Sequence, residues 1–175
     1  MYNKKKRPEG KLVWFHASSV GELLSVIPLV EKIHKRNEIK TILFTTSTLS
    51  SSKILQQKKK LKKVIHQFLP LDTNFFAGKF LDYWKPSSIF FVESEIWPNF
   101  ILNIKERSIP LILLNARITS KTYFAWKKVP DFARKIFSNF NICLVQNKET
   151  KKYLKDLSAR KIKNLGNLTF SNTIY

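Results

Sequence analysis

The chain has 175 residues, 43% of them hydrophobic and 13% aromatic, which is enough for one folded domain with a full core and excludes a disordered chain. Its single cysteine excludes a disulfide framework and a cysteine-based zinc site, and no stretch reaches the roughly 18–20 apolar residues that span a bilayer. The formal net charge of +20 at pH 7 requires a polyanionic partner, namely nucleic acid, an anionic membrane surface or a phosphorylated substrate, unless it reflects composition alone.

Apolar runs rich in β-branched and aromatic residues alternate with segments of helical periodicity along the chain. The predicted strands are 12–16, 41–45, 64–68, 89–92, 111–114, 141–145 and 163–165. The predicted helices are 22–36, 48–60, 74–84, 97–106, 120–127, 130–138 and 148–157. Continuous apolar strands are typical of parallel sheets buried on both faces. The alternation therefore predicts an α/β fold with a doubly wound parallel sheet.

Two further features of the sequence concern the first helix and nucleotide binding. Pro28 lies inside the first predicted helix, where an interior proline costs about 3 kcal/mol, so we expect a kink there. The sequence also contains neither a Walker loop nor a G-x-G-x-x-G motif. Nucleotide binding through those two motifs is therefore excluded.

The sequence Ser-Val-Gly-Glu at 19–22 follows the first predicted strand. Open α/β sheets bind ligands at the carboxyl ends of their strands, which makes Glu22 the best catalytic candidate in the chain. Gly21 allows a tight turn and a close approach of the backbone to a substrate. The same residues also suit an ordinary helix start, because a glutamate charge complements the helix dipole. On the turn alone, both interpretations stay open.

A second polar cluster, residues 93–99, follows the fourth predicted strand. If that strand continued through the cluster, the carboxylates of Glu93 and Glu95 would point to one side. There they could share a proton, coordinate a cation or hold sugar hydroxyls. A metal site needs more ligands than the sequence displays, so we predict no metal. The cluster is equally typical of a charged loop with a packed tryptophan.

Arg117 follows the fifth predicted strand and could pair with a carboxylate such as Glu95 or bind a substrate phosphate. The polar residues beside it are equally typical of a turn and a helix cap. His16 and His66 lie in apolar runs, where a histidine held by internal hydrogen bonds is more usual than a functional one. Lysines outnumber arginines by 26 to 6, which favours diffuse attraction over bidentate recognition.

Six motifs, in their order and spacing, resemble the signature of the 3-deoxy-D-manno-octulosonic acid (Kdo) transferases of lipopolysaccharide synthesis. They are HASSVGE at 16–22, preceded by RPEG at 7–10, then TTST at 45–48, HQFLPLD at 66–72, ESEIWPN at 93–99, NAR at 115–117 and GNL at 166–168. The resemblance covers about residues 7–170, and six motifs in sequence are highly specific. One departure is the serine run at 50–52, where the family has a glycine after the threonine-rich turn.

The resemblance implies a GT-B glycosyltransferase, in which two Rossmann-like domains face each other across a cleft. This chain matches the N-terminal half, so we divide it into a basic N-terminal segment at 1–10, an acceptor-binding domain at 11–170 and the start of an interdomain linker at 171–175. The hydrophobic anchor and the donor domain usual in the family are expected to be absent from this chain. We therefore expect the chain alone to be inactive.

The resemblance also implies the chemistry, an inverting transfer of Kdo from CMP-Kdo to a lipid A precursor, lipid IVA, without a cofactor. Glu22 matches the proposed general base, and we expect it to stay ionised at a helix N-terminus. The positions assigned to substrate binding or to support of the base are Ser19, Gly21, Glu95, Asn99 and Arg117.

The implied partners are the lipid A precursor and an anionic membrane surface at the cytoplasmic face of the bacterial inner membrane, but not nucleic acid. Both partners would give the positive charge a specific target. One alternative is a basic α/β module that binds nucleic acid through lysine-rich faces. Another is a sugar-binding or scaffolding domain that has the fold without the chemistry.

Overall fold

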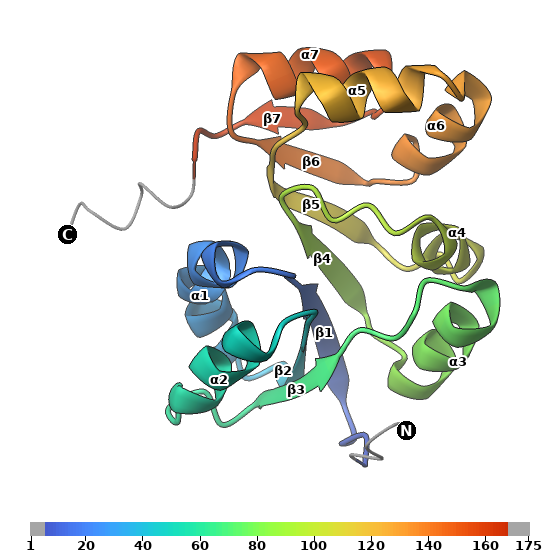
Figure 1. Ribbon diagram of the computed structural model, residues 1–175. Coiled ribbons are helices and arrows are strands. Elements are labelled where there is room, and N and C mark those ends of the chain that lie inside the picture. The colour runs from blue at the N-terminus through green and yellow to red at the C-terminus, as the bar shows by residue number, and fades with distance from the viewer. Residues whose placement is uncertain (1–5, 168–175) are drawn as a thin grey trace.

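The computed structural model describes residues 6–167. Within them, seven strands form one parallel sheet in the order β3-β2-β1-β4-β5-β6-β7 (Figure 1). The strands are β1 (Lys11–His16), β2 (Ile39–Thr46), β3 (Val64–Phe68), β4 (Ser88–Val92), β5 (Leu111–Ala116), β6 (Ile142–Val145) and β7 (Ile162–Asn164). The chain runs outward from β1 to β3, crosses back to β4 and continues to β7. The strand order therefore reverses between β1 and β4, the point where open α/β sheets bind ligands.

Helices connect the strands and start at recognisable sequence signals. The helices are α1 (Val20–His34), α2 (Leu49–Gln57), α3 (Asn74–Trp84), α4 (Pro98–Glu106), α5 (Ser120–Lys127), α6 (Pro130–Phe137) and α7 (Lys148–Asp156). In α1, α2, α3, α5 and α7, the residue before the helix is a serine, threonine or asparagine whose side chain accepts a first-turn N–H. Both α4 and α6 instead begin with a proline, which has no N–H to leave unpaired.

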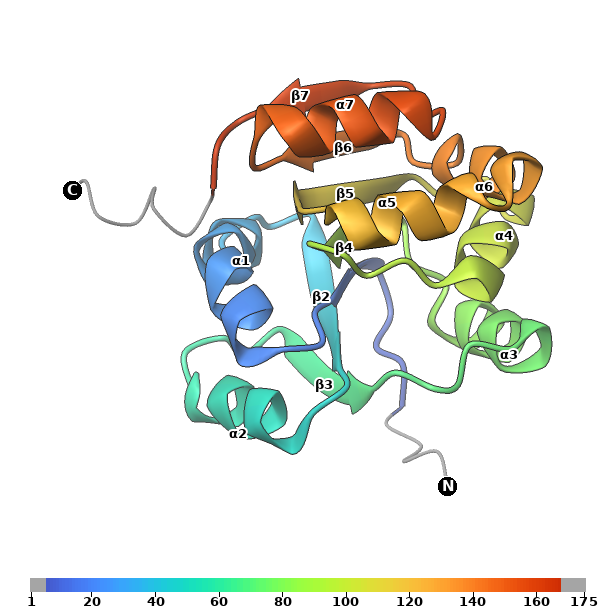
Figure 2. The same ribbon diagram turned by 45° about the horizontal axis from the view of Figure 1, so that its top comes forward.

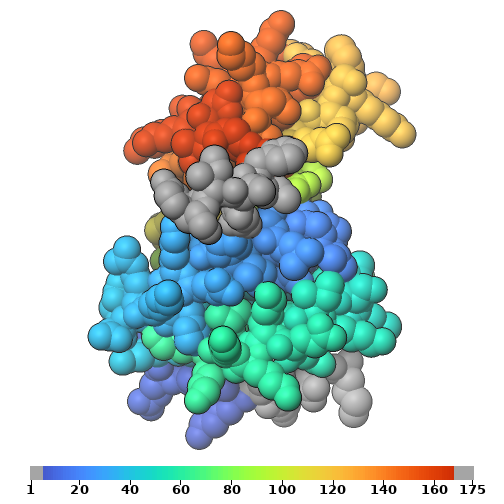
Figure 3. Space-filling view, turned by 90° about the vertical axis from the view of Figure 1, so that its left-hand side faces the viewer, coloured from blue at the N-terminus to red at the C-terminus, as the bar shows by residue number. Residues whose placement is uncertain are grey.

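The sheet separates two hydrophobic clusters. On one side, α1 and α2 lie next to each other (Figures 2 and 3). The cluster that they cover includes the side chains of Phe15 on β1 and Phe44 on β2. On the other side, α3, α4 and α6 cover a larger cluster centred on Trp14. The Trp14 ring lies 4.8 Å from Phe80 and 5.5 Å from Phe100, measured between centroids. Burial on both faces holds β1 and β4, and hence their carboxyl ends, in fixed positions.

The predicted fold class is confirmed, and each predicted strand and helix exists. The first helix begins at Val20 because Ser19 caps it, two residues earlier than expected. Pro28 lies within α1, which continues through it to His34, so the proline does not break the helix; the expected kink stays a prediction. The predicted linker at 171–175 lies outside the described residues. Within 6–167, no helix combines the length and apolar character needed to cross a membrane.

Candidate functional site

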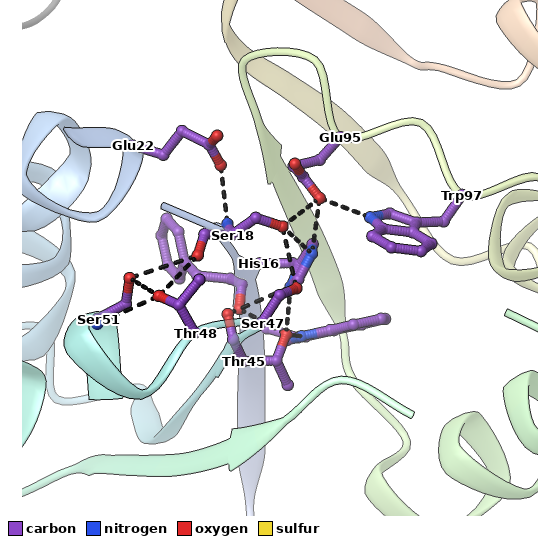
Figure 4. Close-up of polar contacts among 11 residues, drawn as sticks. His16, Ser18, Glu22, Thr45, Ser47, Thr48, Ser51, Glu95 and Trp97 are labelled. Carbon is purple, nitrogen blue, oxygen red and sulfur yellow. Dashed lines mark hydrogen bonds and ion pairs between the residues drawn. The ribbon is translucent and has the colours of Figure 1, made fainter. Parts of the chain in front are cut away.

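The N-terminus of α1 holds Glu22 in a folded-back position. The Oγ of Ser19 accepts a hydrogen bond from the Glu22 N–H at 3.2 Å and caps the helix. The Ser18 N–H in turn donates to the Glu22 carboxylate at 2.8 Å (Figure 4). The bond from Ser18 folds the Glu22 side chain back over the turn, and Glu22 is only 9% exposed. The sequence therefore uses one capping arrangement both to start the helix and to fix a carboxylate at the switch point.

Glu95, in the turn after β4, faces the same point from the neighbouring strand. One of its oxygens, Oε2, accepts from Trp97 Nε1 at 2.7 Å and from Ser18 Oγ at 2.7 Å. The same oxygen lies 2.9 Å from His16 Nε2. Burial alone would raise the pKa of Glu95, but the bonds from His16, Ser18 and Trp97 lower it below the usual glutamate value. Glu95 is thus a carboxylate that stays charged at neutral pH.

The two carboxylates influence each other, and Glu22 is the one that gains proton affinity. Burial, and after it the charge of Glu95, raises the pKa of Glu22 from 4.5 to about 7, although the Ser18 N–H acts in the opposite direction. The helix N-terminus therefore does not keep Glu22 fully ionised at neutral pH, because burial and a like charge bring its pKa to about 7, where protonated and ionised forms coexist. A carboxylate with this pKa suits a general base, since the best proton acceptors have a pKa near the operating pH.

Glu93 and Glu95 do not point to one side as a continued strand would require. Glu93 has a φ of +58°, so the strand ends there and the chain turns. Glu93 then faces β5, where Asn115 Nδ2 donates to it at 3.4 Å. Burial raises the pKa of Glu93, and the charge of Arg117 opposes that rise. Arg117, which is exposed, accordingly has Glu93 as its electrostatic neighbour, not Glu95 as the sequence suggested. No cluster of three or more potential metal ligands occurs within residues 6–167.

Asn99 and Asp72 form a structural tie at the start of α4. The Asp72 carboxylate accepts the backbone N–H of Phe100 at 2.9 Å and that of Asn99 at 3.2 Å. The Asn99 side chain donates back to the Asp72 carbonyl at 2.8 Å. Asp72 therefore supplies the cap that Trp97, the residue before the helix, does not make. The assignment of Asn99 to substrate binding stays a prediction, beside this structural function.

Gly21 has no internal reason to be a glycine. Its φ is not in the left-handed region, so the turn does not require it. A Cβ added there would meet nothing nearer than Ser19 Oγ at 3.9 Å. A glycine within a helix costs about 0.5–1 kcal/mol relative to alanine. The first turn of α1 is therefore exposed and without a side chain at Gly21, next to Glu22.

Sequence reasoning assigned no role to Ser18 or to the hydroxyl groups that surround it. Ser18 Oγ lies 3.0 Å from Ser47 Oγ, and Thr48 Oγ1 donates to the Ser18 carbonyl at 3.3 Å. The loop before α2 thus supports the loop before α1 (Figure 4). The sequence did contain a signal for this cluster, because the three motifs at 16–22, 45–48 and 93–99 supply most of its side chains. His16, considered there as a core histidine, is completely buried, but one of its partners is Glu95.

Comparison with known proteins gives a consistent result. The family model described as 3-deoxy-D-manno-octulosonic-acid transferase (kdotransferase) matches residues 1–172. A 3-deoxy-D-manno-octulosonic acid transferase of Rickettsia felis is 41% identical over 162 residues, which are 92% of this chain and 34% of that protein. A probable mitochondrial one of Arabidopsis thaliana is 42% identical over 69% of this chain and 27% of its own length. The chain thus spans about a third of the length of the curated relatives it matches.

Solved structures support the fold. UDP-GlcNAc 2-epimerase from Neisseria meningitidis has a TM-score of 0.61 at 13% identity, covering 92% of this chain and 47% of the epimerase. MurG of Acinetobacter baumannii has a TM-score of 0.51 at 9% identity, covering 81% of this chain and 42% of MurG. At such identities the likeness concerns the fold alone. It confirms a Rossmann-like domain of the kind that makes up one half of the GT-B architecture.

Proposed function

This chain belongs to the Kdo transferase family, and on that premise we propose that it is the acceptor domain of an inverting glycosyltransferase that moves Kdo from CMP-Kdo to lipid IVA, a lipid A precursor. The observation that carries the proposal is Glu22, a buried carboxylate at the switch point of the sheet whose pKa is raised to about 7. A group with that pKa, at that place, fits a base that deprotonates an incoming hydroxyl. The alternatives of a nucleic-acid module or a non-catalytic domain have no comparable observation in their favour.

In the proposed step, Glu22 takes the proton of an acceptor sugar hydroxyl as its oxygen bonds to the anomeric carbon of Kdo. The bond from that carbon to the phosphate oxygen of CMP breaks on the opposite face, and CMP leaves with the electron pair. The configuration therefore inverts. A base with a pKa of about 7 is sufficient if the hydroxyl loses its proton late, as expected for an oxocarbenium-like transition state. CMP-Kdo would be held by a part of the transferase that this chain does not match.

The surroundings of Glu22 suggest how the acceptor is received. In the proposed complex, a sugar ring approaches the base over Gly21, which is exposed and carries no side chain. Arg117, which is exposed at the same edge of the sheet, offers a positive charge to an acceptor phosphate. Ser19 and Glu95 would complete the acceptor site, although both already make hydrogen bonds within the domain.

Binding of the two substrates to this chain tests the proposal. We expect lipid IVA in detergent micelles to shift the amide NMR signals of residues 18–22 and 93–97, and CMP to leave them unchanged. Shifts with CMP but none with lipid IVA would contradict the assignment of this chain to the acceptor.

An anionic membrane at the cytoplasmic face of the bacterial inner membrane is the second proposed partner, supported by the net charge of +20. Each basic residue near such a surface contributes about 1 kcal/mol at most, and salt screens the attraction. The chain should therefore co-sediment with vesicles containing acidic lipid at low salt, release as salt rises, and bind neutral vesicles weakly. Equal binding to both vesicles, or to neither, would mean that the charge reflects composition alone.

A further inference from the structure

A hydrogen-bond chain runs from the hydrophobic core to the site. The indole Nε1 of Trp14 donates to Thr45 Oγ1 at 2.9 Å. Thr45 Oγ1 lies 2.8 Å from His16 Nδ1, on the inner side of the imidazole. On the outer side, His16 Nε2 lies 2.9 Å from Glu95 Oε2. Trp14, His16 and Thr45 are all completely buried, so water does not compete for these contacts.

The chemistry of these groups gives the chain a direction. An indole N–H can only donate, so Trp14 occupies a lone pair of the Thr45 oxygen and leaves the hydroxyl hydrogen free for Nδ1 of a neutral imidazole. The remaining ring proton then sits on Nε2 and points at Glu95. If the ring is doubly protonated, Nδ1–H can donate to the Thr45 carbonyl, 3.2 Å away, or to the Thr45 hydroxyl, which then turns to the Phe15 carbonyl at 3.4 Å. In both states, Nε2–H faces Glu95.

Ser18 connects this chain to Glu22. Its hydroxyl donates to Glu95 Oε2 at 2.7 Å, and its backbone N–H donates to Glu22 Oε2 at 2.8 Å. One residue therefore holds both carboxylates and fixes them as neighbours (Figure 4). Anything that neutralises or releases Glu95 changes the field at Glu22.

We propose that His16 is a positioning residue for Glu22. The Nε2–H of His16 keeps the Glu95 carboxylate charged and holds it in place beside Glu22. The inference rests on the proposed function only in calling Glu22 a base. The other groups that act on Glu22 are the hydroxyl of Ser19, which caps α1, and the carboxylate of Glu93 in the β4–α4 turn. The charge of Arg117, in the β5–α5 turn, acts on Glu93 in the opposite direction to burial. The charge of Glu95 acts on Glu22 more strongly than that of Glu93.

Two substitutions of His16 separate its inner and outer contacts. His16→Asn retains a polar group at the level of Nδ1, near Thr45, but loses the donor to Glu95. His16→Gln reaches the level of Nε2 and retains that donor. Carboxyl carbon NMR of this chain, labelled at glutamate, follows the titration of Glu22 directly, and Glu22→Gln identifies its signal. Glu95→Gln shows the full effect of removing the charge.

The wild type and His16→Gln should titrate at Glu22 with a midpoint of about 7. Glu95→Gln should lower that midpoint by about 0.5–1 pH unit, because the charge opposite Glu22 is lost. His16→Asn should lower it by a smaller but measurable amount, because Glu95 keeps its bonds from Ser18 and Trp97 and loses only the His16 donor. Both histidine variants leave a small polar side chain in the same buried position, so a general loss of structure would affect them alike. Equal midpoints for His16→Asn and the wild type, with a lowered midpoint for Glu95→Gln, would overturn the proposal. The measurement needs no transferase activity, so failure of the proposed function would not imitate this result.

Discussion

Glu22→Gln is expected to lower kcat by about 10²–10⁴-fold in an active transferase that contains this chain, the usual contribution of a general base. The substitution keeps the size of the side chain and an oxygen that accepts the Ser18 N–H, so the turn before α1 should persist. What it removes is the ability to take a proton. Initial rates with the proposed substrates, CMP-Kdo and lipid IVA, at saturating concentrations measure the effect.

Glu31→Gln, on the same helix but exposed, should leave the rate unchanged. An unchanged rate for Glu22→Gln would remove Glu22 from the chemistry. Because a misfolded variant would also be inactive, the amide spectrum of Glu22→Gln must match that of the wild type before its rate is interpreted.

The same substitution is expected to stabilise the fold at alkaline pH. The pKa of Glu22 is about 7 in the folded chain, against 4.5 for an unperturbed glutamate. The folded state therefore binds the proton more tightly, so its stability falls as pH rises from about 4.5 and levels off above about 7. The loss in the free energy of unfolding that Glu22 causes is about 3 kcal/mol at pH 8, but under about 1 kcal/mol at pH 5. Glutamine carries no charge and escapes this penalty.

Urea unfolding of the wild type and of Glu22→Gln at pH 5 and pH 8 measures the difference. The variant should gain about 2–3 kcal/mol in the free energy of unfolding at pH 8, and much less at pH 5. A gain of equal size at both pH values would point to packing instead of charge. A loss of stability at pH 8 would show that Glu22 is not a strained carboxylate in the folded chain.

The fold and the position of Glu22 could be predicted because both depend on local patterns. Alternating apolar runs and helical periods specify a doubly wound sheet, and the edge of such a sheet that binds ligands follows from its topology. Residues 19–22 come within a few positions of the end of β1, so their place at that edge required no knowledge of distant contacts. The helix starts were equally local, since Ser19 and the other cap residues act within one turn.

The interactions between motifs could not be predicted, because they depend on how the chain turns and on what packs around it. The left-handed φ of Glu93 directs Glu93 and Glu95 to different neighbours, and nothing in the sequence marks that backbone angle. The contact between His16 and Glu95 joins residues 79 positions apart. The raised pKa of Glu22 follows from burial, a tertiary property, whereas the helix dipole alone predicted the opposite.

The pH dependence of kcat/KM tests most directly whether Glu22 acts as the base. In an active transferase that contains this chain, kcat/KM should fall tenfold per unit on the acid side, with a midpoint near the pKa of about 7 that burial and Glu95 give to Glu22. That acid limb should disappear in Glu22→Gln, whose residual rate should not depend on this titration. A wild-type profile that stays flat from pH 5 to pH 8, or an acid limb that persists unchanged in Glu22→Gln, would contradict the account.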